Sequence, residues 1–238
     1  MKVDILAIGV HPDDVELCCS GTIFKHIAEG YKVGILDLTK GELGTRGTPE
    51  IRAAEAAEGA RIMGVEFRKN IGLRDGFFEI SESSINPIIE VVRYCQPDII
   101  LANAIQDRHP DHGRASELVE QACFLAGLHR IETNYEGVLQ SRWRPKAIYH
   151  YIQDFQLKPD LIVDITAHMD KKMEAILAFK SQFYDPNSPE PTSPISGKEF
   201  LDYVKSISAA MGRRIGADYG EGFNVMRPIG VKDLVKLD

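Results

Sequence analysis

Two short clusters of histidine and aspartate contain the residues of this sequence that are best suited to chemistry. The first is His11-Pro12-Asp13-Asp14, and the second is DRHPDH, which runs from Asp107 to His112. Imidazole nitrogens and carboxylate oxygens are the usual donors of a catalytic zinc site, which takes about three protein ligands and keeps one position open for water. Two histidines and one aspartate meet this requirement. The clusters therefore predict a metal site.

Hydrolysis at such a site also needs a base that takes a proton from the attacking water and a positive group that faces the oxyanion. A carboxylate beside the metal ligands suits the base, and a non-ligand imidazole suits the oxyanion or the leaving amine. The spacing alone does not decide which aspartate or histidine has which role. An aspartate after a strand is often only a helix cap. The concentration of both residue types in two equivalent places, among seven histidines in all, favours the metal site.

The clusters must be positioned by the strands that precede them. β-rich runs alternate with helical patterns in the N-terminal half, which is typical of βαβ units around a mainly parallel sheet. A buried strand over residues 3–9 precedes the first cluster, and a strand over residues 99–103 precedes the second. Ligands of open α/β sheets bind outside the carboxyl ends of the strands, so we expect both clusters to face one crevice. Further strands are expected over residues 31–38, 65–71, 147–152 and 161–165, and helices over 20–29, 49–63, 85–95, 113–127, 168–179 and 198–211.

Composition limits the class of protein. The 238 residues, of which 44% are hydrophobic and 26% charged, predict a single globular domain over residues 1–238. The net charge of -7 argues against binding to nucleic acid or to an anionic membrane and favours a small-molecule partner. No apolar run reaches the ~20 residues of a membrane span, and the N-terminal run lacks the features of a signal peptide. We therefore expect no membrane partner, a cytoplasmic location, and four reduced cysteines, since none forms a CxxC pair.

The segments that contain the two clusters resemble a known family. GVHPDDVELCCSGT at residues 9–22, followed by RHPDH at 108–112, resembles the LmbE-like, or PIG-L, family of N-acetylglucosaminyl deacetylases. The resemblance implies a Rossmann-like fold and a zinc-dependent amide hydrolase that acts on N-acetylglucosamine conjugates. It further implies that His11, Asp14 and His112 bind the metal, that Asp13 is the general base, that His109 stabilises the oxyanion, and that Asp111 orients His109. Such a ligand set would accept Fe²⁺ or Co²⁺ as well as Zn²⁺.

Three further segments resemble the compact bacterial branch that makes the thiol cofactor bacillithiol. They are EIR at residues 50–52, KMEAILAFKSQF at 172–183 and ADYGEGF at 217–223. In that branch the substrate is N-acetylglucosaminyl malate, and the compact members form homo-oligomers, hexamers included. The two carboxylates of malate favour arginine, whose planar fork makes paired hydrogen bonds. Arg52 and Arg108 lie nearest the expected strand ends and are the candidates for substrate binding; alternatively, Arg52 forms only a surface pair with Glu55.

Two other functions remain open. One is deacetylation of another amide with the same metal and base, such as a diacetylchitobiose-like sugar or a bacillithiol S-conjugate. The other is a non-catalytic regulatory α/β module whose acidic loops hold Mg²⁺, although the sequence has no Gly-rich phosphate loop and magnesium seldom favours two imidazoles. Some relatives place a C-terminal tyrosine near the metal. The resemblance places Phe200 of this chain at that position, with Tyr203 and Tyr184 nearby.

Overall fold

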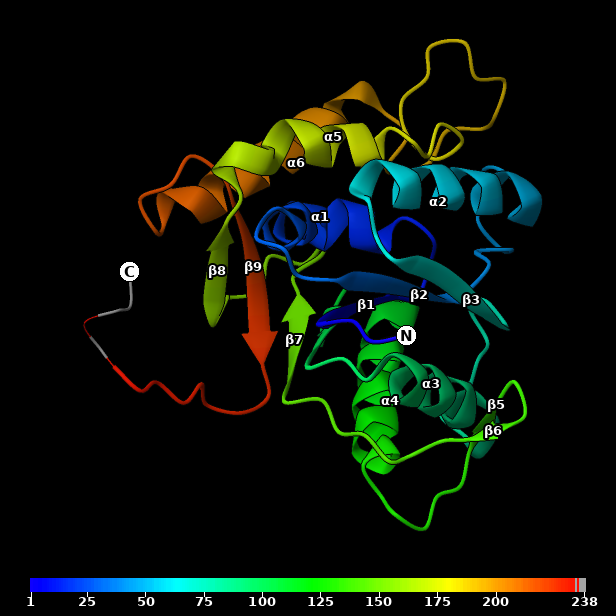
Figure 1. The fold of residues 1–238 in the computed structure, drawn as a ribbon. Coiled ribbons are helices and arrows are strands. Elements are labelled where there is room, and N and C mark those ends of the chain that lie inside the picture. The colour runs from blue at the N-terminus through cyan, green and yellow to red at the C-terminus, as the bar shows by residue number, and fades with distance from the viewer. Residues whose placement is uncertain (234, 236–238) are drawn as a thin grey trace.

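A twisted seven-stranded sheet lies at the centre of the molecule, in the computed structural model that describes residues 1–233 and 235 (Figure 1). Its strand order is β3-β2-β1-β4-β7-β9-β8. The strands are β1 (Ile5–Gly9), β2 (Val33–Thr39), β3 (Phe67–Leu73), β4 (Ile99–Ala102), β7 (Ala147–Tyr151), β8 (Leu161–Asp164) and β9 (Gly220–Val225). The helices are α1 (Asp14–Ala28), α2 (Pro49–Met63), α3 (Glu82–Cys95), α4 (Pro110–Ala126), α5 (Met169–Ile176) and α6 (Lys198–Arg213), with a 3-10 turn η1 (Thr166–His168) before α5.

The topology of the sheet places β1 beside β4. Strands β3, β2, β1, β4 and β7 are parallel to one another, whereas β9 runs antiparallel to both β7 and β8. The chain moves outward in one direction from β1 to β3 and then returns to β4 on the other side of β1, so the strand order reverses between β1 and β4. This reversal is the position at which doubly wound sheets bind ligands. The predicted α/β, mainly parallel and Rossmann-like fold is confirmed.

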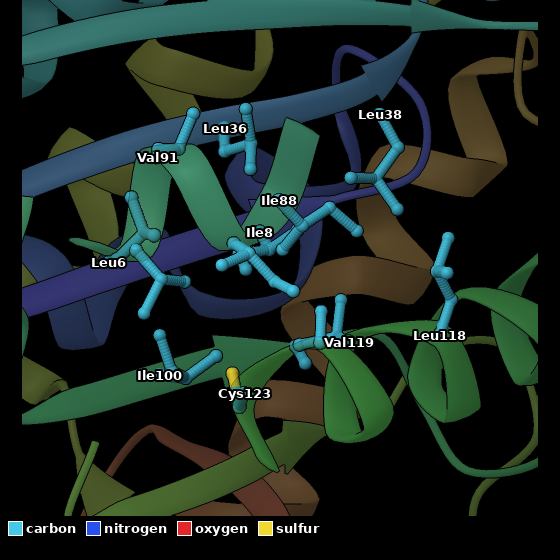
Figure 2. Close-up of a cluster of buried hydrophobic side chains, with 14 of the residues drawn as sticks. Leu6, Ile8, Leu36, Leu38, Ile88, Val91, Ile100, Leu118, Val119 and Cys123 are labelled. Atoms are coloured by element: carbon cyan, nitrogen blue, oxygen red, sulfur yellow. The ribbon is translucent and has the colours of Figure 1, made fainter. Parts of the chain in front are cut away.

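Helices cover both faces of the sheet. Helices α3 and α4 lie on one face, and α1, α2, α5 and α6 lie on the other (Figure 1). All five residues of β1 and all seven of β2 are buried, as expected for strands with an apolar layer on each side. Figure 2 shows the cluster under α3 and α4, where Leu6, Ile8 and Ile100 of the sheet meet Ile88 and Leu118 of the helices. Among the residues that the structure describes, none of the helices combines the length and the apolar character that a membrane crossing requires.

Two predicted helix boundaries are wrong in a way that matters for the site. Helix α1 begins at Asp14 instead of residue 20, and α4 begins at Pro110 instead of residue 113. The first starts early because the amide of Asp14 donates to the carbonyl of His11, which closes a turn directly after β1. The second starts at Pro110 because proline suits the first helical position and the ring of His109 caps the helix. Asp14 and His112 therefore stand on the first turns of two helices, where their side chains are held firmly.

The C-terminal part differs more from expectation. Helix α5 ends at Ile176 instead of residue 179, and tight turns then bury Phe179 and Phe183. Strand β9 was not predicted, because its sequence GEGFNV contains two glycines, which are typical of turns. A Cβ atom at Gly220 would lie 2.6 Å from Cγ2 of Ile162, so this glycine permits close packing. The short hairpin of β5 (Asn134–Tyr135) and β6 (Val138–Leu139) was also not anticipated. All four cysteines are unpaired, as predicted.

Candidate active site

The two clusters meet at the carboxyl ends of β1 and β4. The first cluster follows β1, the second follows β4, and the two strands are hydrogen-bonded neighbours. The cavity between them has a volume of about 230 Å³. Its lining includes the four predicted residues His11, Asp13, Asp14 and His112, together with residues of α6 on the opposite side. The expectation that two ligand-rich loops share one crevice is therefore met by the geometry.

His11, Asp14 and His112 form a compact donor set. The Asp14 carboxylate lies with Oδ1 3.4 Å from Nε2 of His112 and with Oδ2 3.8 Å from Nδ1 of His11. None of the three side chains is more than 12% exposed to solvent. Asp14 thus directs a different oxygen toward each imidazole, and carboxylate and imidazole donors are of the kind that a small divalent cation binds.

Two further carboxylates fix the orientation of both imidazoles. Oδ2 of Asp107 lies 2.6 Å from Nδ1 of His112, and Oδ1 of Asp75 lies 3.0 Å from Nε2 of His11. These contacts leave Nε2 of His112 and Nδ1 of His11 facing Asp14. Metal-binding histidines are usually held in this way by a carboxylate on the other ring nitrogen. The donor set therefore fits a zinc-like ion in chemistry as well as in composition.

Sequence reasoning missed both of these carboxylates. Asp107 stands within the second cluster but was given no role. Asp75 follows β3 in the turn Asp75-Gly76 and was also given no role. Its carboxylate also accepts a hydrogen bond from the amide of Leu43 at 2.9 Å, which holds it against His11. The available signal was its position two residues after a strand end.

The electrostatics of the cluster are those of closely packed opposite charges. Although burial opposes it, the imidazoles of His112 and His11 lower the pKa of Asp14. Burial likewise acts against protonation of the imidazoles, but the neighbouring carboxylates prevail and raise the pKa of His11 to about 10 and that of His112 to about 9. In the absence of a cation, protons on the two rings balance the negative charge of the aspartates.

The same region offers two other groupings of donors. Ring nitrogens of His11, His109 and His112 lie within 4.8 Å of one another, and donor atoms of His11, Asp75 and Asp111 do so as well. His11 belongs to both groupings, so it is central to whichever set binds a cation. The grouping with Asp75 and Asp111 uses Nε2 of His11, whereas Nδ1 of the same ring faces Asp14. The assignment of the ligands to His11, Asp14 and His112 stays a prediction.

Asp13 lies beside the donor set in an unusual backbone conformation. Its φ of 132° and ψ of -22° are rarely adopted by residues other than glycine, and such strain is often found at functional positions. Nη2 of Arg52 lies 3.1 Å from Oδ2 of Asp13 and also donates to the carbonyl of Pro12 at 2.6 Å. Burial raises the pKa of Asp13 to about 7, although Arg52 acts in the opposite direction. A carboxylate with this pKa can both accept and return a proton near neutral pH.

His109 and Asp111 are placed in the site, but not in the expected relation. The carboxylate of Asp111 accepts hydrogen bonds from the amide of Gly76 and from Arg114, each at 2.8 Å, and its Oδ2 lies 3.6 Å from Nε2 of His11. It is the backbone amide of Asp111 that donates to Nδ1 of His109, at 3.3 Å. The carboxylate is turned away because α4 begins at Pro110, which makes the ring of His109 a helix cap. Burial and the neighbouring imidazoles lower the pKa of His109.

The two candidate substrate-binding arginines lie at different depths. Arg52 is buried, and its Nε atom has no hydrogen-bond partner among the described residues. Arg108 lines the cavity at the rim, where its side chain is 52% exposed and pairs with Asp154 at 2.7 Å. The surface pair of Arg52 with Glu55 is not formed; Glu55 accepts hydrogen bonds from Ser181 instead.

Helix α6 closes the far side of the cavity. Phe200 and Tyr203 line it, and the hydroxyl group of Tyr203 lies 3.5 Å from the side-chain nitrogen of Gln156. Tyr184 is 40% exposed and does not belong to the lining. Deeper in the cavity, Nζ of Lys172 donates to Glu221 at 2.6 Å, and both side chains are buried. Apolar side chains and one buried ion pair thus form the wall opposite the two clusters.

Comparison with known proteins agrees with this site. The family model for PIG-L, described as GlcNAc-PI de-N-acetylase, matches residues 6–123, which contain both clusters. The conserved protein TT1542 from Thermus thermophilus has a structure that superposes with a TM-score of 0.85 at 34% identity over 98% of each chain. Diacetylchitobiose deacetylase from Thermococcus kodakarensis is 28% identical over 229 residues, 92% of this chain and 81% of that protein.

A third relative has a different activity. The 4-oxalmesaconate hydratase of Pseudomonas putida is 24% identical over 196 residues, which cover 74% of this chain and 73% of the hydratase. The family model and the whole-length likeness to TT1542 nevertheless agree with the motifs from which the resemblance was recognised. The chain therefore belongs to the PIG-L, or LmbE-like, family, and its domain is a deacetylase domain of the class that hydrolyses amide C–N bonds.

Proposed function

We propose that this protein is a zinc-dependent hydrolase that removes the acetyl group from N-acetylglucosaminyl malate, as in bacillithiol biosynthesis. The observation that carries the proposal is that the buried base Asp13 lies directly beside the donor set, with His109 in the same cavity. The choice of substrate is supported by the sequence segments that resemble the bacillithiol branch and by arginines at two depths of the cavity.

His11, Asp14 and His112 are proposed to hold the zinc ion, with Fe²⁺ or Co²⁺ as alternatives. When bound, the ion supplies a lower pKa for water and polarises the acetamide carbonyl. The remaining chemistry belongs to the side chains. Asp13 accepts the proton of the attacking water, which its pKa of about 7 allows near neutral pH. Arg52 keeps the carboxylate of Asp13 in place through their ion pair.

His109 is proposed to act on the other side of the reacting amide. Because Nδ1 of His109 accepts a hydrogen bond from the amide of Asp111, the N–H of a neutral ring is on Nε2. That nitrogen can donate to the oxyanion, while Asp13 returns to the leaving amine the proton that it took from the water. Arg108, at the exposed rim, is proposed to bind a carboxylate of the malate group in exchange for its exposed pair with Asp154.

The test is an assay of acetate and free amine released by the purified, metal-analysed protein. N-acetylglucosaminyl malate is compared with N-acetylglucosamine, diacetylchitobiose and a bacillithiol S-conjugate, for the wild type and for Asp13→Asn, and hydration of 4-oxalmesaconate is assayed beside them. We expect metal-dependent turnover of the malate conjugate, reduced by ~10²–10⁴-fold in the variant, which is the range for general base catalysis. Faster turnover of diacetylchitobiose or of a bacillithiol S-conjugate would contradict the substrate. Hydration of 4-oxalmesaconate without release of acetate would contradict the reaction.

A further inference from the structure

Gln153 is a buried amide that the site described above does not yet use. It follows the end of β7, beside the loop after β4, and lines the cavity. Its Oε1 atom accepts two hydrogen bonds, one from the amide of Ala104 and one from Nδ2 of Asn103, both at 3.0 Å. Because both partners are donors, this atom is the oxygen, and the NH₂ group must point in the other direction.

Asn103 is itself fixed in orientation by the backbone. Its Oδ1 atom accepts the amide of Val10 at 2.9 Å, so Nδ2 is directed toward Gln153 and toward Oδ2 of Asp14, which it meets at 2.9 Å. The direction of each hydrogen bond is thus fixed by main-chain amides, those of Val10 and Ala104, which can only donate. The NH₂ group of Gln153 therefore cannot exchange places with its oxygen without leaving two buried donors without an acceptor.

The NH₂ group of Gln153 lies against the predicted ligand atoms. Nε2 is 3.2 Å from Oδ1 of Asp14 and 3.5 Å from Nε2 of His112. A protonated or metal-bound His112 has no lone pair for Gln153, and the Asp14 carboxylate becomes a weaker acceptor when it binds a metal. A buried amide donor is then left beside the reacting group and needs a new acceptor. The carbonyl oxygen of a substrate amide is an acceptor of the required kind.

We propose that Gln153 is a catalytic residue that donates its Nε2–H to the carbonyl oxygen of the scissile N-acetyl group and stabilises the oxyanion together with His109. This inference rests on the proposed deacetylase function. It assigns the oxyanion to donors from two neighbouring loops, since His109 precedes α4 and Gln153 follows β7. Removal of one such donor typically lowers kcat by about 10²–10³.

Two substitutions separate this role from a purely structural one. Gln153→Leu removes the donor at similar volume; we expect kcat to fall by about 10²-fold, with KM and zinc affinity within about threefold of the wild type. Gln153→Glu keeps an oxygen for Asn103 and Ala104 but places a second oxygen beside Asp14 and His112. We expect that oxygen to become a fourth protein ligand. Metal affinity then rises, kcat falls, and the visible absorption of the Co²⁺-loaded protein changes.

Two controls complete the design. Gln121→Leu changes an exposed glutamine on α4, bonded to Glu117, and should leave all parameters unchanged. Asn103→Ala should lower zinc affinity and kcat together, because Asp14 loses its nearer side-chain donor and the amide of Val10, next to His11, loses its acceptor. If Gln153→Leu keeps the wild-type kcat, or loses zinc in the manner of Asn103→Ala, the proposal is overturned. A wild type that deacetylates no N-acetyl sugar would instead refute the proposed function, and this inference with it.

Discussion

Oδ2 of Asp107 lies 2.6 Å from Nδ1 of His112, and this contact determines which nitrogen of the ring faces Asp14. Both residues come from the second cluster, five positions apart, but they are joined across the start of α4. The Asp107 side chain is buried and also accepts the amide of Phe155 at 2.7 Å. The carboxylate thus connects the orientation of a proposed ligand to the loop after β7.

Asp107→Asn is expected to weaken zinc binding by about 10–100-fold, the usual effect of removing a carboxylate behind a metal-binding histidine. The amide still fills the space but no longer stabilises positive charge on the ring. The measurement is a competition titration with a chelator of known affinity. Asp154→Asn is the matched control, because Asp154 lies on the loop after β7 and pairs with the exposed Arg108 instead of a histidine. Equal zinc affinities for the two variants would contradict the prediction.

Zinc affinity is expected to rise with pH. The pKa values of about 10 for His11 and about 9 for His112 mean that both rings are protonated at pH 7 in the metal-free protein. Binding must release these protons, so the apparent affinity grows by up to tenfold per pH unit for each proton displaced. Calorimetry between pH 6 and 8, in buffers of different ionisation enthalpy, counts the protons released. Release of no protons at pH 7 would show that these imidazoles are not the ligands.

Arg52→Met is expected to move the acid limb of the kcat/KM profile to higher pH. Arg52 lowers the pKa of Asp13 through their ion pair, against the effect of burial, so its removal raises that pKa. The base must be deprotonated to act. At a pH below the pKa, each increase of the pKa by one therefore reduces the active fraction about tenfold. The loss should diminish as the pH is raised.

Arg108→Met is the control for this profile. Arg108 also lines the cavity but lies at its rim and pairs with Asp154 instead of Asp13. If it binds a carboxylate of the substrate, its loss should raise KM for the malate conjugate and leave the acid limb in place. An acid limb that shifts in Arg108→Met, or stays fixed in Arg52→Met, would contradict the assignment of Arg52 to Asp13.

The main features of the site could be predicted from sequence because they are local. Each cluster concentrates its imidazoles and carboxylates within a few residues, directly after a strand whose apolar run is visible in the sequence. The crevice follows from general rules of parallel sheets, since strands that share a direction end at the same edge. No long-range contact had to be known to predict a metal site here, whereas the choice of His11, Asp14 and His112 as ligands came from the family resemblance and stays a prediction.

Asp75 and Gln153 could not be found in this way because neither belongs to a cluster of histidine and aspartate. Their importance comes from the order of strands in space, which brings the ends of β3 and β7 to the two clusters. Strand β9 could not be predicted from the sequence for a related reason. Its glycines are required by contacts with Ile162 and Ile152, which are distant in sequence, and local propensity alone assigns glycine to turns.

The buried pair of Lys172 and Glu221 gives a prediction about stability. Nζ of Lys172 lies 2.6 Å from both Oε1 of Glu221 and the carbonyl of Leu17, and Glu221 also accepts the amides of Gly21 and Thr22 in α1. Lys172→Met leaves the carboxylate buried without a counter-charge, so we expect the free energy of unfolding to fall by ~3–5 kcal/mol. Urea denaturation monitored by circular dichroism measures the change.

The exposed pair of Lys146 and Asp98 provides the comparison, since its N–O distance is also short, 2.7 Å, but the lysine side chain is 72% exposed. Lys146→Met should lower the free energy of unfolding by at most ~1 kcal/mol, because solvent screens the pair. Adding Glu221→Gln to Lys172→Met removes the unpaired charge while keeping an acceptor for α1, so part of the lost stability should return. If both lysine variants lower the free energy of unfolding by the same amount, or if the double variant is less stable than Lys172→Met, the ion pair does not stabilise the packing of β9 and α5 against α1.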